Sequence, residues 1–221
     1  LGLLTSLTSL SLSDNQLDGS LPSTLGSLTA LRGLTLGHNS FAGTLPAALG
    51  SLTALTLLVV NSNQLTGAIP VTLGSLTALL FLALRTNQLT GSLPSTLGSL
   101  SALKVMYVNS NQLNGAIPDT VGSLSALTGL FVDTNQLTGA IPATLGSLTA
   151  LATLGLQTNM ITGTFPPALC SLSSLLELKA GDNSLTGPLP SCLGTLSGVQ
   201  EVQLQGNCLT GVIPVEYGSL S

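Results

Sequence analysis

The 221-residue chain carries four lysine or arginine residues and eight aspartate or glutamate residues, so its net charge is −4 at pH 7. Four scattered basic side chains cannot form the positive surface that binds a phosphate backbone, which argues against a nucleic-acid partner. The longest apolar run, Ala78 to Leu84, is far shorter than the roughly 18 residues of a membrane-spanning helix, so we predict no membrane insertion by this segment.

The sequence repeats itself at an interval of 24 residues along its whole length. One asparagine in each copy, which we call the repeat asparagine, keeps this interval without a slip. These residues are Asn15, Asn39, Asn63, Asn87, Asn111, Asn135, Asn159, Asn183 and Asn207. A repeat of this length is a supersecondary unit that buries its apolar face only against its neighbours. We therefore predict a single solenoid over residues 1–221, built from nine repeats of 24 residues.

The two ends of the chain lie within the repeat pattern. The first copy opens directly at Leu1, and the residues from Tyr217 onward begin a further copy. Repeat stacks normally carry an atypical, polar unit over each open end. We therefore expect this segment to be part of a longer polypeptide, with the caps elsewhere in that chain.

Each copy contains an apolar segment, typified by Leu79 to Leu84, in which successive side chains change sides. Leu82 and Leu84 are expected to point into the coil, and Phe81 and Ala83 to point out of it, which is the period of a β-strand. Because every copy runs in the same direction, the strands are predicted to stack as a parallel sheet. The repeat asparagine follows this strand, where its amide can satisfy backbone groups that the turn leaves unpaired.

Glycine and proline mark the remainder of each copy. A glycine recurs at all nine positions from Gly19 to Gly211, which predicts a positive φ or a backbone too close to its neighbour for a Cβ. A proline recurs at all nine positions from Pro22 to Pro214, where it fixes φ and removes a donor. The outer wall is therefore predicted to consist of turns and short helical pieces.

The full pattern, L-x-x-L-x-L-x-x-N-x-L-x-G-x-[IL]-P-x-x-L-G-x-L, resembles the plant-type subclass of leucine-rich repeats. That subclass occurs in the ectodomains of receptor-like kinases and receptor-like proteins and in polygalacturonase inhibitors. The resemblance implies an α/β repeat solenoid, a right-handed coil with a concave parallel β-sheet and a convex side of turns and short 3-10 helices. It also implies an extracellular or cell-surface recognition module whose partner is a protein, a peptide or a glycan.

The outward positions of the predicted sheet differ between copies and identify a candidate site. Apolar side chains on four adjacent strands form what we call the concave patch: Leu57, Val59, Phe81, Ala83, Val105, Tyr107 and Phe131. Arg85, Asn109 and Asp133 are expected to line its rim. Aromatic residues with arginine beside them are typical of binding hot spots, and an apolar patch on a wet face usually marks an interaction site. Two alternatives remain open, namely that such residues simply suit a sheet or that another part of a longer chain covers them.

The three cysteines lie in the last third of the chain. Cys170 and Cys192 occupy nearby places in adjacent copies, so a disulfide is allowed if their Cα atoms come within about 7 Å. The alternative is that each is a small buried hydrophobe. Cys208 is expected to be a free thiol or to find a partner outside this segment.

Catalytic and metal-binding patterns are weak, so we predict no enzyme, no cofactor and no metal site. His38 lies one coil from Asp14, but no nucleophile is uniquely placed beside them, and an exposed ion pair is the simpler interpretation. Glu177 and Glu201 are stacked neighbours that should repel one another.

Two other functions compete with recognition. Uniform, nearly uncharged coils could self-associate as a structural component of an extracellular fibre or coat. Regular threonine rows are also typical of ice-binding surfaces, although duplication alone produces such rows. One row comprises Thr66, Thr90, Thr138, Thr162, Thr186 and Thr210, and the other comprises Thr24, Thr72, Thr96, Thr120 and Thr144.

Overall fold

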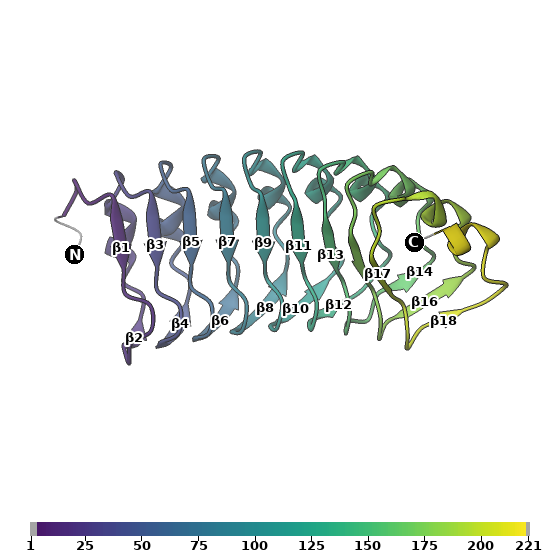
Figure 1. The fold of residues 1–221 in the computed structure, drawn as a ribbon. Coiled ribbons are helices and arrows are strands. Elements are labelled where there is room, and N and C mark those ends of the chain that lie inside the picture. The colour runs from purple at the N-terminus through teal and green to yellow at the C-terminus, as the bar shows by residue number, and fades with distance from the viewer. Residues whose placement is uncertain (1–3, 220–221) are drawn as a thin grey trace.

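The computed structural model describes residues 4–219 as a gently curved solenoid in which the coils stack in sequence order from one end to the other (Figure 1). Each coil contributes one strand to a long sheet, one strand to a second wall and one short helix. The predicted right-handed repeat solenoid with a parallel sheet is confirmed.

The long sheet is parallel and has nine strands, in the order β1-β3-β5-β7-β9-β11-β13-β15-β17. The strands are β1 (Ser9–Ser11), β3 (Gly33–Thr35), β5 (Leu57–Val59), β7 (Phe81–Ala83), β9 (Val105–Tyr107), β11 (Gly129–Phe131), β13 (Thr153–Gly155), β15 (Glu177–Lys179) and β17 (Glu201–Gln203). Each has three residues, so the strand expected over Leu79 to Leu84 is shorter than predicted. The chain enters and leaves each coil by turns, and only the central residues stay in register with the next coil.

The core lies between the walls and is a column of leucines. Leu82 and Leu84 are fully buried, as the alternation predicts, and the same holds for their equivalents Leu58 and Val60 one coil earlier. Full burial of one such side chain contributes about 1.5–3 kcal/mol. Because each coil packs only on its neighbours, this stabilisation is distributed along the stack.

A second wall of β-structure was not predicted. Its six-stranded part comprises β2 (Asp18–Ser20), β4 (Ser40–Thr44), β6 (Gln64–Ala68), β8 (Gln88–Ser92), β10 (Gln112–Gly115) and β12 (Gln136–Leu137), and its three-stranded part comprises β14 (Thr162–Gly163), β16 (Ser184–Gly187) and β18 (Cys208–Leu209). We call these strands the second sheet. They pair 22 residues apart, as in Thr44 with Thr66, whereas strands of the long sheet pair 24 apart, as in Leu58 with Leu82. The repeat glycine lies within or beside these strands. Because glycine at a recurring position is typical of a turn, the sequence predicted turns rather than strands for this wall.

The convex side carries short 3-10 helices, as predicted. They are η1 (Ser23–Ser27), η2 (Ala47–Ser51), η3 (Val71–Ser75), η4 (Ser95–Ser99), η5 (Asp119–Ser123), η6 (Ala143–Ser147), η7 (Pro167–Ser171), η8 (Ser191–Thr195) and η9 (Val215–Ser219). The repeat proline directly precedes each helix, and in η4 Pro94 has φ −64° at the N-cap. Its ring fixes the φ from which the helix starts. Within residues 4–219, no helix is both long and apolar enough to cross a membrane.

The repeat asparagines join neighbouring coils by hydrogen bonds. Asn111 Nδ2 donates to Leu84 O of the preceding coil at 3.1 Å and to Val108 O and Asn109 O of its own coil at 3.1 and 3.2 Å. Its Oδ1 accepts the backbone N–H of Leu89 at 3.0 Å. One buried side chain thus satisfies four backbone groups, which explains why the turn requires an asparagine.

Two glycine positions set the shape of a coil for different reasons. The repeat glycine adopts a positive φ, for example +72° at Gly67, as predicted. The glycine of L-G-S-L instead lies against the next coil. A Cβ on Gly98 would come within 2.6 Å of Thr120 Cβ and closer still to the Thr120 backbone oxygen, so only glycine fits there. In the seventh coil Cys170 replaces this glycine, and it forms a disulfide with Cys192, with 5.6 Å between their Cα atoms.

Candidate binding surface

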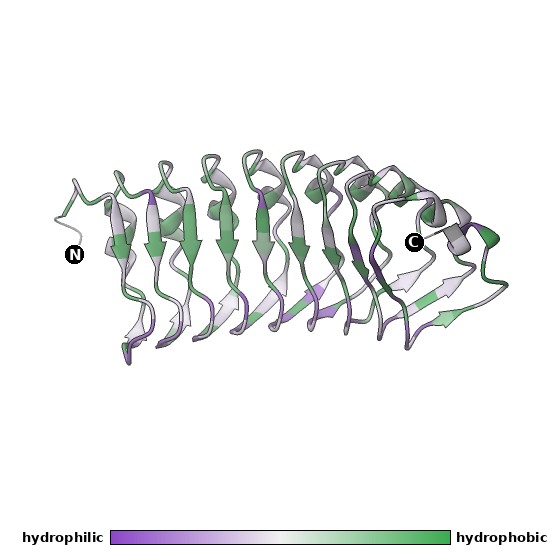
Figure 2. Ribbon diagram, in the orientation of Figure 1, coloured by the Kyte–Doolittle hydropathy of each residue, from purple (hydrophilic) through white to green (hydrophobic). Residues whose placement is uncertain are grey.

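The residues of the concave patch lie on adjacent strands in direct register. Leu57 pairs with Phe81 and Phe81 with Val105, and Val59, Ala83, Tyr107 and Phe131 are successive partners on β5, β7, β9 and β11. Figure 2 shows hydrophobic colour along β5 and β7, on the face that carries the long sheet. The patch is therefore one continuous surface.

Three aromatic rings form a row across this patch. Phe81 and Tyr107 have ring centroids 5.7 Å apart at an interplanar angle of 55°, and Tyr107 stacks on Phe131 at 4.4 Å and 16°. Arg85 lies at the rim, with its Cζ 5.1 Å from the centroid of the Tyr107 ring, where a cation is attracted by the ring electrons. The rings hold one another in place, so the row is a preorganised apolar ridge. All three are half-buried and keep part of their surface exposed.

A hollow of about 340 Å³ adjoins the ridge on the side of the N-terminal coils. It is lined by Ser13, Asp14, His38, Val59, Asn61, Phe81, Ala83, Arg85 and Tyr107. Ala83 was predicted to form part of the exposed patch, but it is only 3% exposed because it lies between the larger Val59 and Tyr107. It forms the floor of the hollow rather than a contact surface.

The polar wall of this hollow was not predicted. Asn61 is buried, and its Nδ2 lies 3.2 Å from His38 Nε2, which accepts a hydrogen bond when the ring is neutral and protonated on Nδ1. The exposed ion pair expected between His38 and Asp14 does not form, since the ion pairs of the described residues all involve Lys179. Arg85 was predicted as a rim residue, and reading its column back by 24 and by 72 residues, to Asn61 and Ser13, would have revealed the rest of this wall.

The same rim continues, two coils beyond Arg85, at Asp133. Its side chain is half-buried, and burial raises the pKa of its carboxyl. Hydrogen bonds with its own backbone, Asn109 and Thr134 lower this pKa, but the effect of burial is larger. Asn109 Oδ1 and Gln157 Oε1, on the two adjacent coils, are buried and accept no hydrogen bond from the described residues. This rim is therefore rich in acceptors that have no donor. Gln157 was not predicted as a site residue.

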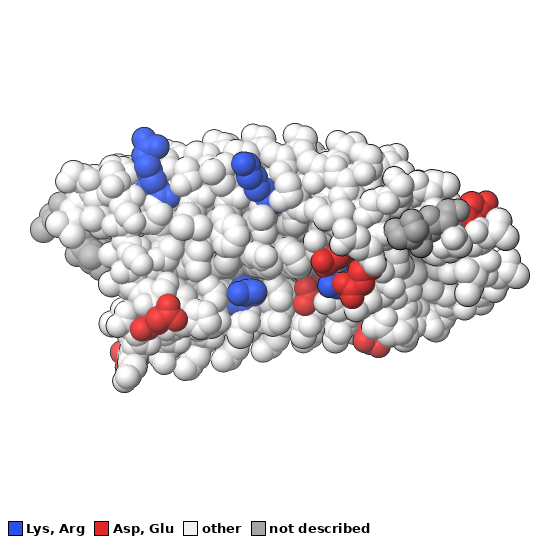
Figure 3. All heavy atoms as spheres, viewed as in Figure 1, with Lys and Arg blue, Asp and Glu red and all other residues white. Residues whose placement is uncertain are grey.

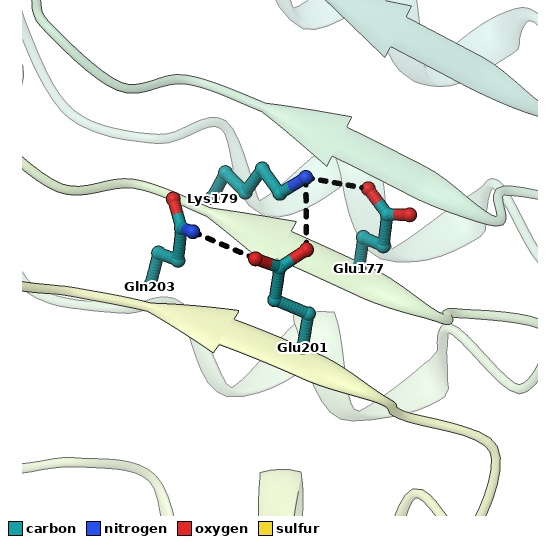
Figure 4. Close-up of polar contacts among 4 residues, drawn as sticks. All are labelled: Glu177, Lys179, Glu201 and Gln203. Carbon is teal, nitrogen blue, oxygen red and sulfur yellow. Dashed lines mark hydrogen bonds and ion pairs between the residues drawn. The ribbon is translucent and has the colours of Figure 1, made fainter.

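Further along the long sheet, charged side chains compensate one another. Figure 4 shows Lys179 of β15 between two carboxylates: its Nζ lies 2.8 Å from Glu177 Oε2 and 2.9 Å from Glu201 Oε2. Gln203 Nε2 donates to Glu201 Oε1 at 2.7 Å. The hydrogen bonds from Lys179 to Glu177 and Glu201 raise the pKa of the Lys179 ammonium. The expected repulsion between the two glutamates is therefore offset by Lys179, which lies between them and was not part of the prediction.

The two threonine rows have different roles. In the row that includes Thr72, Thr96, Thr120 and Thr144, each hydroxyl donates to a backbone oxygen of the preceding coil at 2.7–2.8 Å, so it is not free for a ligand. In the other row, most members are exposed along the second sheet: Thr90, Thr138, Thr162, Thr186 and Thr210. Thr66 of that row is half-buried.

No cluster of three or more histidine, cysteine, aspartate or glutamate side chains that could hold a metal ion occurs in the described part of the chain. Cys208 follows the repeat asparagine of the last full copy, and its thiol is exposed and free.

Residues 63–213 match a family model described as a leucine-rich repeat region, and residues 6–28 match one described as a leucine rich repeat. No curated protein sequence matches the chain. These matches cover the central and C-terminal coils and the first coil.

Several solved structures superpose on this solenoid. The plant peptide hormone receptor RGFR1, in complex with RGF2, gives a TM-score of 0.98 at 34% identity over 99% of this chain and 35% of that chain. The Arabidopsis receptor kinase HAESA, in complex with the peptide hormone IDA and the co-receptor SERK1, gives 0.94 at 38% identity over 99% and 37%. A plant ice-binding protein gives 0.82 at 30% identity over 97% and 69%. The chain thus spans little more than a third of the length of the two receptor chains.

Proposed function

This chain belongs to the leucine-rich-repeat family, with repeats of the plant type, and from that premise we propose that it is a non-enzymatic extracellular module that binds a peptide or protein on the concave patch. Peptide hormones are the ligands of the two receptors it resembles. The disulfide between Cys170 and Cys192 supports an extracellular location, since such bonds persist in oxidising compartments.

The observation that carries this proposal is the row of three rings. Phe81, Tyr107 and Phe131 lie side by side on adjacent strands of a face whose other strands are mostly polar or small. Exposed aromatic clusters of this kind provide large contact area at low conformational cost, and they dominate binding energies when a partner covers them. The rim residues Arg85, Asn109 and Asp133 would then fix the orientation of the ligand.

The test uses peptides selected on the whole chain from a library of randomised linear peptides. We expect the double variant Tyr107→Ala, Phe131→Ala to weaken their binding by about thirtyfold or more, because each truncation removes a central hot spot. Isothermal titration calorimetry measures the change. The matched control is Val71→Ala, Met160→Ala, which truncates two exposed apolar residues outside the concave patch and should leave the affinity unchanged.

Equal affinity of the patch variant and the unmodified chain would contradict the proposal. Growth of particle size with protein concentration in light scattering would instead favour a structural component that assembles with itself. A monodisperse chain that binds selected peptides favours a recognition module.

A second candidate function, ice binding, is favoured by one observation. Thr90, Thr138, Thr162 and Thr186 are exposed along the second sheet, at intervals of 48, 24 and 24 residues because Asn114 interrupts the row, on a wall that contains few charged residues. If this wall binds ice, the chain should show thermal hysteresis in a nanolitre osmometer, and Thr138→Lys with Thr162→Lys should abolish it because bulky charges break the flat surface. A chain without thermal hysteresis at millimolar concentration would exclude this function.

A further inference from the structure

The hollow beside the aromatic row is large enough to receive one side chain of a ligand. Its volume of about 340 Å³ lies at the lower end of the range for ligand pockets, which begins near about 300 Å³. Ala83 forms its floor, and Val59 and Tyr107 occupy the same place on the strands to either side. Neighbouring strands lie about 4.8 Å apart, so a methyl group between two larger side chains leaves a depression about two strand spacings wide.

The walls of the hollow suit an aromatic ring. Val59, Phe81 and Tyr107 supply its apolar surface, and Arg85 lies beside them. The Arg85 guanidinium forms no ion pair with any described residue, and its Cζ lies 5.1 Å from the centroid of the Tyr107 ring. Because a guanidinium stacks on aromatic faces, a ring placed in the hollow would be attracted to Arg85 as Tyr107 is.

The charges around the hollow balance. Asp14 and Arg85 carry opposite charges, and neither forms an ion pair in the described part of the chain, where all ion pairs involve Lys179. With His38 neutral, the lining carries no net charge. Figure 3 shows isolated basic and acidic groups on a face that is otherwise uncharged. The hollow therefore offers no net attraction to an anion or to a cation, and a neutral group suits it best.

One buried amide in the hollow has an unused hydrogen-bond acceptor. Asn61 is only 5% exposed, and its Nδ2 lies 3.2 Å from His38 Nε2 and donates to Ser62 Oγ at 3.1 Å. Its Oδ1 extends over Gly37, where an added Cβ would lie 2.7 Å from it, and accepts no hydrogen bond from the described residues. Unlike Asn109 Oδ1, this oxygen is not sealed from solvent. A donor on a ligand would therefore satisfy it.

We propose that the hollow is the subsite for a tyrosine side chain of the bound peptide, with the phenol ring between Val59 and the Arg85 guanidinium and the hydroxyl donating to Asn61 Oδ1. The proposal rests on the proposed function, because it assigns one residue of that ligand. A phenol combines the three required properties, since it is neutral, has an aromatic face and carries a donor at its end. Phenylalanine lacks the donor, and lysine or glutamate brings a charge that the balanced lining does not compensate.

The first experiment selects randomised linear peptides on the whole chain and on Ala83→Leu, which fills the floor of the hollow. The position tolerates larger side chains, because Val59 and Tyr107 occupy it in the neighbouring coils, so the variant should fold. We expect a tyrosine at a fixed distance from a second apolar residue in the first set and no tyrosine preference in the second.

The second experiment compares two synthetic copies of one selected peptide, with tyrosine or with phenylalanine, by isothermal titration calorimetry. The change to phenylalanine should weaken binding to the unmodified chain about fivefold or more, and should have no effect on binding to Asn61→Ala. The matched control is Gln205→Ala, which removes an exposed amide in the same column six coils later. On that control the change to phenylalanine should cost as much as on the unmodified chain. Misfolding cannot mimic this result, because both peptides are measured on the same variant.

Two kinds of result would overturn the proposal, and they differ in what they imply. The first is an equal cost of the change to phenylalanine on Asn61→Ala and on the unmodified chain, or enrichment of an acidic residue whose binding falls on Arg85→Gln. If Tyr107→Ala with Phe131→Ala still weakens binding, either outcome removes the tyrosine subsite and leaves the proposed function. Peptides whose binding depends on neither the rings nor Asn61, or a selection that enriches none, would remove both.

Discussion

Gly98→Ala is expected to lower the free energy of unfolding by about 3 kcal/mol, the upper part of the range for overpacking. The new methyl group would meet the backbone of Thr120, including its carbonyl carbon at 2.8 Å, and backbone cannot rotate away as a side chain can. The two coils must separate to admit it. The midpoint of urea unfolding, followed by circular dichroism, measures the loss.

Gly218→Ala is the matched control. Gly218 occupies the same place in its copy as Gly98, 120 residues later, and an added Cβ would meet no atom within 4 Å. We expect this change to alter stability by no more than about 0.5 kcal/mol. Equal unfolding midpoints for the two variants would show that close approach of neighbouring coils does not depend on the glycine.

Asn111→Leu is expected to cost about 1–3 kcal/mol, because it leaves backbone groups unsatisfied in a buried turn. Asn111 is only 9% exposed, and its side chain serves Leu84 O, Val108 O and Leu89 N, so leucine would strand groups in two coils. Chemical denaturation measures the cost. Loss of hydrogen-exchange protection at the Leu89 N–H would show that the destabilisation arises from the hydrogen bond that this group makes to Asn111 Oδ1.

Asn15→Leu provides the comparison within the same set of repeat asparagines. Asn15 is exposed, and its recorded hydrogen bonds reach only Leu12 O and Ser13 O of its own coil. Water can replace these bonds, so the variant should lose well under 1 kcal/mol. If Asn15→Leu and Asn111→Leu were equally destabilising, the bonds between coils would not be the source of the effect.

The sequence predicted those parts of the fold that recur in every copy. The inward leucines follow from the period of a strand, and the positive φ of Gly67 follows from its place in all nine copies. The second sheet was missed because its strands are as short as two residues and contain the glycine that indicates a turn. A positive φ also occurs directly before each repeat asparagine, at residues such as His38 and Thr86, whose identity gave no indication of it.

The candidate site was predictable in position but not in detail. Columns spaced by 24 residues placed Tyr107 beside Phe131, and the structure shows the two rings stacked. Column spacing cannot tell how side chains bend towards one another. It therefore missed the bridging of two glutamates by Lys179, the covering of Ala83 by larger neighbours and the burial of Asp133.

Photocrosslinking from the concave patch tests most directly whether the partner binds there. The photoreactive residue p-benzoylphenylalanine replaces Phe131 in one variant and the exposed Thr138, beside β12 of the second sheet, in another. We expect a selected peptide to be captured from position 131 and not from position 138, with the crosslink suppressed by excess unlabelled peptide. Capture from position 138 with none from position 131 would contradict binding on the concave face.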